Sequence, residues 1–216
     1  MQKIAVLISG RGSNMLGIAE RCRQEQWPAR IVAVISNRPR AAGLRAAADL
    51  GLATEAIDHT GFTERVDFDA ALADRLEALG VDWIVLAGFM RVLGDAFVTR
   101  FAGRIVNIHP SLLPAFPGLH THRRALEAGV RLHGATVHLV TSSLDLGPIV
   151  AQAAVPVLDG DDPDRLAERV LAAEHRLYPM AVRWLVEGRI LVEGQRCRLR
   201  EPREGEAQWF VASPPA

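Results

Sequence analysis

Short apolar runs alternate along the chain with longer stretches in which apolar residues recur at helical spacing. Residues 3–8 form a run of apolar and β-branched side chains that ends at Ser9 and Gly10, which is typical of a strand buried on both faces of a parallel sheet. The same pattern predicts further strands at residues 30–36, 53–57, 82–87, 104–109, 135–140, 149–157 and 190–192.

Helices are predicted between these strands. Helical apolar spacing marks them, with Ser13 or Asn14 as a cap for the first and glycines after the ends of the others. Strand and helix in alternation imply right-handed βαβ crossovers, so we expect an α/β protein, a mostly parallel sheet with helices on both faces. The helices cover residues 13–24, 43–50, 65–79 and 164–187.

Composition and charge narrow the class of protein. Hydrophobic residues make up 49% and charged residues 23% of the 216 positions, which suits one ordinary globular α/β domain. The 25 basic and 25 acidic residues cancel, so no global field gathers nucleic acid. Cys22 and Cys197 lie far apart in the sequence and form no CxxC pair, which argues against a disulfide framework or a zinc–thiolate site.

The lengths of the apolar runs bear on membrane insertion and export. No apolar run reaches the roughly 18 residues of a membrane span. The first run, of about six residues, is too short for the core of a signal peptide. We therefore expect a cytoplasmic protein without a membrane partner. Residues 194–216 are polar and end in prolines, which predicts a partly disordered surface tail.

A glycine-containing turn follows the first strand and opens the first helix. Its residues are Gly10, Arg11, Gly12, Ser13 and Asn14. Glycine lets the backbone turn tightly, and the free amides at a helix start attract phosphate. The turn lacks the third glycine of a dinucleotide fingerprint and the lysine of a P-loop. Locally, a phosphate site and a plain capped turn are equally good interpretations.

Asn107 and His109 end the fifth predicted strand. Residues two apart on a strand point to the same side, so both side chains are expected at the carboxyl edge of the sheet, where ligands bind. An amide beside an imidazole can stabilise an oxyanion and pass on a proton. A carboxylate nearby would favour the charged imidazole. Asp145 could supply one, but the local pattern favours a turn aspartate, and nothing links it to His109.

Other histidines raise the question of a metal. His120, His122, His133 and His138 have no accompanying HExxH or similar carboxylate pattern, so we predict no metal site.

Five segments together resemble the phosphoribosylglycinamide formyltransferase family, the folate-dependent enzymes of purine biosynthesis. The resemblance spans roughly residues 3–192. The most specific segment is 107–126, in which NIHPSLLP indicates formyltransferases in general and the continuation FPGLHTH points to the glycinamide branch. The segments are VLISGRGSN at 6–14, VLAGFMRVL at 85–93, NIHPSLLPAFPGLHTHRRAL at 107–126, HLVTSSLDLGPIVAQ at 138–152 and EHRLYP at 174–179.

The resemblance implies a Rossmann-like half at about 1–100 and a folate-binding half at about 101–193 of one formyltransferase domain. It also implies a transferase that moves formyl from 10-formyltetrahydrofolate, with no metal, to phosphoribosylglycinamide, as a monomer or homodimer. The implied catalytic residues are Asn107, His109 and Asp145; Gly10 to Asn14 hold the substrate phosphate, and Glu174 lies near the substrate amine. The implied folate contacts are Arg65, Met90, Arg91, Val92, Leu93, Asn107, Thr141, Ser142, Ser143, Leu144 and Asp145.

The resemblance also implies a cis peptide bond between Leu113 and Pro114. Two positions depart from the family pattern. Arg11 is charged where relatives often carry a smaller neutral residue, and Leu171 is apolar where some relatives are polar, so no substrate contact is carried over to position 171.

Three kinds of protein remain as alternatives. Methionyl-tRNA formyltransferases share the Asn-x-His pattern but add a domain for tRNA, for which this chain lacks the length and the basic charge. Formyltetrahydrofolate deformylases, which transfer formyl to water, usually carry an extra N-terminal domain; another small-substrate formyltransferase is also possible. A non-catalytic nucleotide-binding module would need the glycine turn but has no use for Asn107, His109 and Asp145 together.

Overall fold

The computed structural model describes residues 1–212, and the chain divides into two compact units. One unit holds residues 1–107 and 140–142, and the other holds residues 108–139 and the chain from 143 onward. The family resemblance implied two functional halves that meet at about residue 100, and that division stays a prediction; the first boundary between the compact units falls after residue 107.

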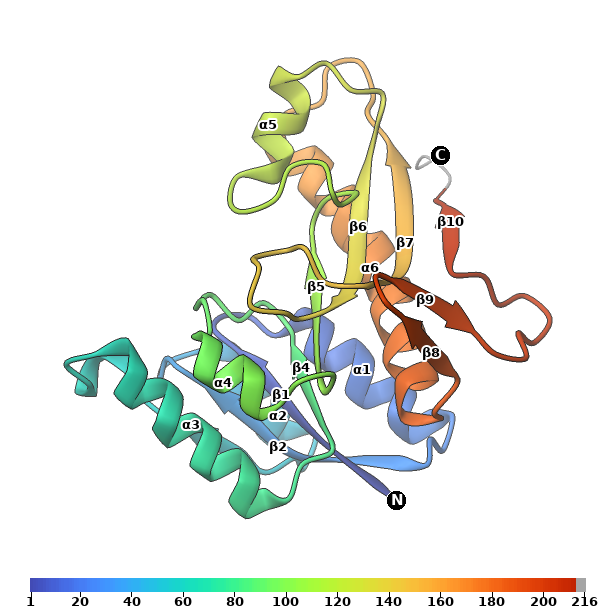
Figure 1. Ribbon diagram of the computed structural model, residues 1–216. Helices are drawn as coiled ribbons and strands as arrows, with labels where there is room; N and C mark the ends of the chain where they lie inside the picture. Colours follow the sequence, from blue (N-terminus) through green and yellow to red (C-terminus); the bar gives the residue numbers. More distant parts are fainter. Residues whose placement is uncertain (213–216) are drawn as a thin grey trace. The chain divides into compact units, whose positions relative to one another are not determined.

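The first unit is built on a parallel sheet (Figure 1). Its strands run in the order β3-β2-β1-β4-β5. Every residue from Ile4 to Ile8 of the central strand is fully buried, which explains the continuous apolar run in the sequence. The strands are β1 (Gln2–Ile8), β2 (Ala29–Ser36), β3 (Thr54–Ala56), β4 (Trp83–Leu86) and β5 (Ile105–His109), of which β5 ends in the second unit.

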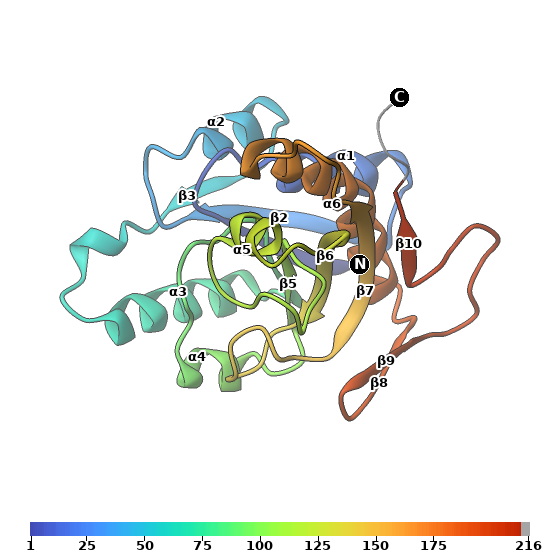
Figure 2. The same cartoon turned by 90° about the horizontal axis from the view of Figure 1, so that it is seen from above.

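Helices cover both faces of this sheet. In Figure 2, α1 and α2 lie on one side of β1 and β2, and α3 and α4 lie on the other. On the second face, Phe68, Leu72 and Phe97 belong to one buried apolar cluster together with Leu7 and Ile84 of the sheet. The helices are α1 (Ser13–Gln24), α2 (Ala42–Asp49), α3 (Arg65–Leu79) and α4 (Asp95–Arg100), with a 3₁₀ turn η1 (His59–Gly61).

The second unit centres on an antiparallel pair of strands, β6 (Leu132–Leu139) and β7 (Ile149–Pro156). The long helix α6 (Pro163–Val186) packs against both strands. Asp162 caps it by accepting a hydrogen bond from the amide of Arg165 at 2.8 Å. A shorter helix, α5 (Thr121–Glu127), contacts α6. The face that α6 buries carries apolar residues at helical spacing: Leu166, Val170, Ala173, Leu177, Ala181 and Trp184.

Close approach of β6 and β7 depends on Gly134. A Cβ atom at this position would lie 1.9 Å from the carbonyl oxygen of Ala153 in β7. We predict that Gly134→Ala lowers the free energy of unfolding by about 3 kcal/mol, the upper end of the usual overpacking cost, because the obstacle is backbone. Urea unfolding measures the change. Gly61→Ala is the matched control, since an added Cβ there meets no atom within 4 Å; equal unfolding midpoints for the two variants would refute the prediction.

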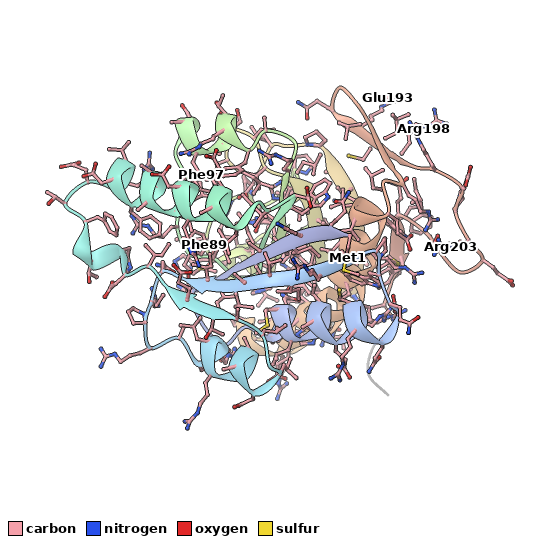
Figure 3. The ribbon with its side chains drawn as sticks, turned by 90° about the horizontal axis from the view of Figure 1, so that it is seen from below. Met1, Phe89, Phe97, Glu193, Arg198 and Arg203 are labelled. Carbon is pink, nitrogen blue, oxygen red and sulfur yellow. The ribbon has the colours of Figure 1, made fainter. Side chains whose placement is uncertain are left out.

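Residues after α6 form further strands rather than only a surface extension. β8 (Ile190–Glu193) and β9 (Arg196–Leu199) make an antiparallel hairpin, and β10 (Trp209–Val211) pairs parallel to β7. Glu206 ties the segment down: its carboxylate pairs with Arg189 and accepts a hydrogen bond from the indole of Trp184. Figure 3 labels Glu193 and Arg198 on the hairpin and Arg203 on the loop that follows. Residues 213–216 of the predicted tail lie outside the described residues.

The predicted α/β class is confirmed, with two refinements. The strand pairs of the first unit are parallel, but β6–β7 and β8–β9 are antiparallel, which the apolar runs alone did not distinguish. The short helices α4 and α5 and the strands β9 and β10 were not predicted. Across residues 1–212, no helix is long and apolar enough to cross a membrane.

Candidate active site

The glycine turn joins β1 to α1 as predicted, but its capping differs. Gly12 is the residue before the helix, in the left-handed conformation with φ 74°, and no side chain caps the start. The prediction that Ser13 or Asn14 caps the helix was therefore wrong; both residues lie inside the first turn. The left-handed backbone conformation at position 12 favours glycine over other residues. The first backbone amides of α1 thus have no side-chain cap, and a bound phosphate could accept hydrogen bonds from them.

A second glycine holds this turn in place. The amide of Gly43, in the first turn of α2, donates to the carbonyl oxygen of Gly10 at 2.9 Å. A Cβ at position 43 would lie 3.0 Å and 3.1 Å from the carbonyl oxygens of Gly10 and Arg11 and 2.6 Å from Ile8. The turn is therefore packed against backbone on one side, and Arg11 remains exposed.

Residues Met90 to Leu93 follow β4 without regular secondary structure. Met90 and Val92 are 63% and 55% exposed, whereas Leu93 is buried and the guanidinium of Arg91 lies 4.9 Å from the ring centre of Phe68. Side chains therefore alternate between core and solvent, and two apolar ones are left facing outward. Arg65 begins α3 and lines a cavity of about 280 Å³ together with Asp69 and Gly94.

His109 and Asp145 come together as a buried pair in the second unit. Nδ1 of His109 lies 3.5 Å from Oδ2 of Asp145, and each side chain is 8% exposed. The amide of Gly118 donates to the same carboxylate oxygen at 2.9 Å, and Nε2 of His109 lies 3.1 Å from the carbonyl oxygen of Phe116. Both ring nitrogens thus face oxygen atoms that can accept a proton, Nδ1 at ion-pair distance and Nε2 within hydrogen-bond distance.

Asp145 adopts an unusual backbone conformation, with φ 54°. Aspartate tolerates this left-handed region better than most residues. The second carboxylate oxygen, Oδ1, lies 3.8 Å from Nε2 of His138. Burial lowers the pKa of His138, so this neighbour stays neutral near pH 7 and leaves the carboxylate to His109.

Two further histidines surround the pair. The rings of His122 and His133 meet edge to face with centres 5.3 Å apart, and His133 also contacts Phe116 edge to face. Burial lowers the pKa of His133 to about 4, with smaller contributions from the nearby His122 and His109, while the Pro110 carbonyl opposes the shift. Burial and the nearby His109 also lower the pKa of His122.

A pH-dependent stability follows from His133. Its pKa in the folded chain lies below the ordinary value near 6.5, so the folded state is favoured above pH 6.5 and loses this advantage as the pH falls toward 4. The lowering of the His133 pKa from 6.5 to about 4 corresponds to about 3 kcal/mol of unfolding free energy. We predict that His133→Phe flattens the fall in unfolding free energy between pH 6.5 and 4. Neither ring nitrogen has a well-formed hydrogen bond among the described residues, so phenylalanine should be tolerated. Urea unfolding at four pH values tests this; parallel curves for both proteins would contradict it.

The formyl transferase family matches residues 2–182. This chain belongs to that family. The phosphoribosylglycinamide formyltransferase of Escherichia coli (strain K12) is 46% identical over 87% of this chain and 88% of its own length. The trifunctional purine biosynthetic protein adenosine-3 of Drosophila melanogaster is 47% identical over 88% of this chain, which corresponds to 14% of that longer protein.

A solved structure agrees at the level of the fold. The crystal structure of glycinamide ribonucleotide transformylase 1 from Symbiobacterium toebii has a TM-score of 0.90 and 51% identity, covering 93% of this chain and 95% of that one. The predicted resemblance to the phosphoribosylglycinamide formyltransferases is thereby confirmed.

The remaining residues that the family resemblance implied are distributed over both units. Thr141 and Ser142 belong to the first unit, and Ser143, Leu144 and Asp145 to the second. Leu144 is 57% exposed in the turn before Asp145. Glu174 is buried at 7% exposure on α6, and Asn107 precedes His109 by two residues on β5. The expected cis bond is present at Leu113–Pro114.

Several partners of these formyl transferase residues were not singled out from the sequence. The carbonyl of Phe116 and the amide of Gly118 are backbone groups, for which no residue pattern exists. His138 was noted only as a possible metal ligand, although it lies on the strand before the Asp145 loop. Within the described part of the chain, no group of three His, Cys, Asp or Glu residues is arranged to hold a metal ion.

Proposed function

We propose that this chain transfers the formyl group of 10-formyltetrahydrofolate to the amine of 5′-phosphoribosylglycinamide. The products are formylglycinamide ribonucleotide and tetrahydrofolate, as in de novo purine biosynthesis. The observation that carries the proposal is the buried His109–Asp145 pair in a member of the formyl transferase family. The names of the similar proteins from E. coli and Symbiobacterium toebii support the glycinamide substrate.

The reaction needs no covalent enzyme intermediate. The substrate amine attacks the formyl carbon, the new C–N bond forms, and the carbonyl oxygen becomes an oxyanion. Collapse of this tetrahedral intermediate breaks the bond to N10 of the folate, and the proton lost by the amine balances the one that N10 gains. A donor aimed at the oxyanion and a group that handles protons are what this sequence of steps requires.

His109 is proposed to supply both. Asp145 holds the imidazole in orientation and compensates its positive charge, as a buried carboxylate can at 3.5 Å. Nε2 of His109 faces the Phe116 carbonyl in this structure, so the oxyanion would take over as its acceptor. The side-chain amide of Asn107, two residues earlier on β5, is the proposed second donor.

Binding roles are proposed for the other residues of the family pattern. The amides of residues 10–14 would hold the substrate phosphate, because a helix start favours an anion. Glu174 would orient the substrate amine. The folate would lie against Met90 to Leu93 and residues 141–145, with Arg65 available to a folate carboxylate.

Mass spectrometry tests the proposal directly. The protein is incubated with formyl-¹³C 10-formyltetrahydrofolate with and without phosphoribosylglycinamide, and the label is followed. We expect labelled formylglycinamide ribonucleotide only when the amine substrate is present. Release of labelled formate at the same rate in both mixtures would instead indicate a deformylase, and no turnover in either would support a binding module.

A further inference from the structure

The segment from Met90 to Gly94, called here the 90–94 segment, has no regular secondary structure, yet its two ends are fixed by buried side chains. The amide of Met90 donates to Oγ of Ser9 at 2.8 Å, and the amide of Gly94 donates to Oδ2 of Asp69 at 2.8 Å. Ser9 lies at the end of β1 and Asp69 on α3, so the anchors come from different elements.

Both anchors are themselves held firmly. Ser9 is 3% exposed; its hydroxyl donates to Oδ1 of Asn37 at 2.5 Å, and its amide donates to the carbonyl of Gly88 at 3.1 Å. A hydroxyl has one donor and two acceptor lone pairs, so Oγ can bond Asn37 and Met90 at the same time. Asn37 is 2% exposed, which makes this a buried connection with little freedom.

Asp69 is 5% exposed and serves the other end of the segment. Its Oδ1 has no hydrogen-bond partner among residues 1–212, so the carboxylate bonds the Gly94 amide through Oδ2 alone. The close approach requires a glycine, since a Cβ at position 94 would lie 3.1 Å from Oδ2. A buried carboxylate with a single partner is costly to keep for stability alone, which favours a role in shaping the segment.

Between its anchors the segment packs against the apolar core. Leu93 belongs to the buried cluster, and Phe89 and Phe97, on either side of the segment in sequence, pack there too (Figure 3). The side chains of Met90 and Val92, in contrast, face outward. Apolar side chains on a backbone that is anchored at both ends suit a flat heteroaromatic ring.

We infer that Ser9 and Asp69 are positioning residues that hold the 90–94 segment in the shape in which it receives the folate ring. The inference rests on the proposed function, because it takes that segment as the folate contact. Ser9 also adjoins Gly10, so one buried hydroxyl connects the phosphate turn with the folate segment. Asp69 bonds the other end of the folate segment, at Gly94.

Tetrahydrofolate binding, measured by isothermal titration calorimetry, tests the inference. We expect Ser9→Ala and Asp69→Ala each to raise the Kd for tetrahydrofolate about tenfold, since each removes one anchoring hydrogen bond. Asp69→Asn keeps an acceptor for the Gly94 amide and should stay within about twofold of the wild type. Asp67→Ala, at an exposed aspartate on the same helix, is the matched control.

Steady-state kinetics separate positioning from general damage. For Asp69→Ala we expect the KM for 10-formyltetrahydrofolate to rise about tenfold, with the KM for phosphoribosylglycinamide and kcat within about threefold. Wild-type folate affinity in Ser9→Ala, or equal losses in Asp69→Asn and Asp69→Ala, would overturn the inference, and the Ser9 variant decides alone if Asp69→Ala does not fold. Absence of tetrahydrofolate binding by the wild-type protein would instead overturn the proposed function.

Discussion

Replacing His109 with alanine is expected to lower kcat about 1000-fold, the largest effect of any single substitution considered. The imidazole is 8% exposed and lies between the Asp145 carboxylate and the Phe116 carbonyl. A water molecule that fills the vacated space is a far weaker acid and base near neutral pH than an imidazole. Loss of the imidazole removes both the proposed oxyanion donor and the proton carrier. The KM values of both substrates should stay within about threefold, because the phosphate turn and the 90–94 segment are untouched.

Initial rates of tetrahydrofolate formation give kcat and both KM values. The control is His175→Ala, at an exposed histidine on α6, which should retain wild-type turnover. Circular dichroism at the assay temperature establishes that both variants are folded. A His109→Ala protein that keeps more than a tenth of wild-type kcat would show that the imidazole is not the group on which the chemistry depends.

Asp145→Asn is expected to lower kcat about 100-fold. Asparagine preserves the shape, tolerates the left-handed backbone at φ 54° and can still accept the bond from the Gly118 amide. What it loses is the negative charge 3.5 Å from Nδ1 of His109. The substitution therefore isolates electrostatics from folding better than Asp145→Ala does.

The same rate assay measures this variant. Asp159→Asn is the matched control, because it makes the same substitution at an aspartate that is 96% exposed and pairs with Arg131 on the surface. Such an exposed pair contributes little. If the two variants had the same kcat, the carboxylate at position 145 would have no electrostatic role in turnover.

The periodicity of apolar residues predicted the framework of the first unit because its central strands β1 and β4 are buried along most of their length. Residues 13–24 and 65–79 were predicted as helices with the same bounds that α1 and α3 have. In the second unit, β6 is also buried along nearly its whole length, so its apolar run did not reveal that it is antiparallel to β7. Direction is set by the connection, and the connection between the two strands, residues 140–148, is too short for a helical crossover.

The candidate site was predictable where residue type carries information. Asn107 and His109 were found from the alternation of a strand, and Gly10 to Asn14 from the chemistry of a helix start. The pairing of Asp145 with His109 was not derivable from local sequence, because it joins a loop to a strand 36 residues away along the chain. Resemblance to a family suggested the aspartate, and the structure places it.

Ser9 and Asp69 illustrate a further limit. A serine before a glycine turn and an aspartate on an amphipathic helix are both ordinary in sequence, and only their burial and their bonds to Met90 and Gly94 set them apart. Charge on the buried face of α3 was a signal that could have been noticed. Its partner could not, because Gly94 contributes only a backbone amide.

The central claim is that Asp145 acts on formyl transfer through His109. A double-mutant cycle on kcat, with His109→Ala, Asp145→Asn and the combined variant, measures this coupling. The account predicts that the combined variant is slower than His109→Ala by less than about threefold, because the carboxylate has nothing left to act on. Losses that multiply, near 100,000-fold for the combined variant, would mean that the two side chains work independently and would contradict the account.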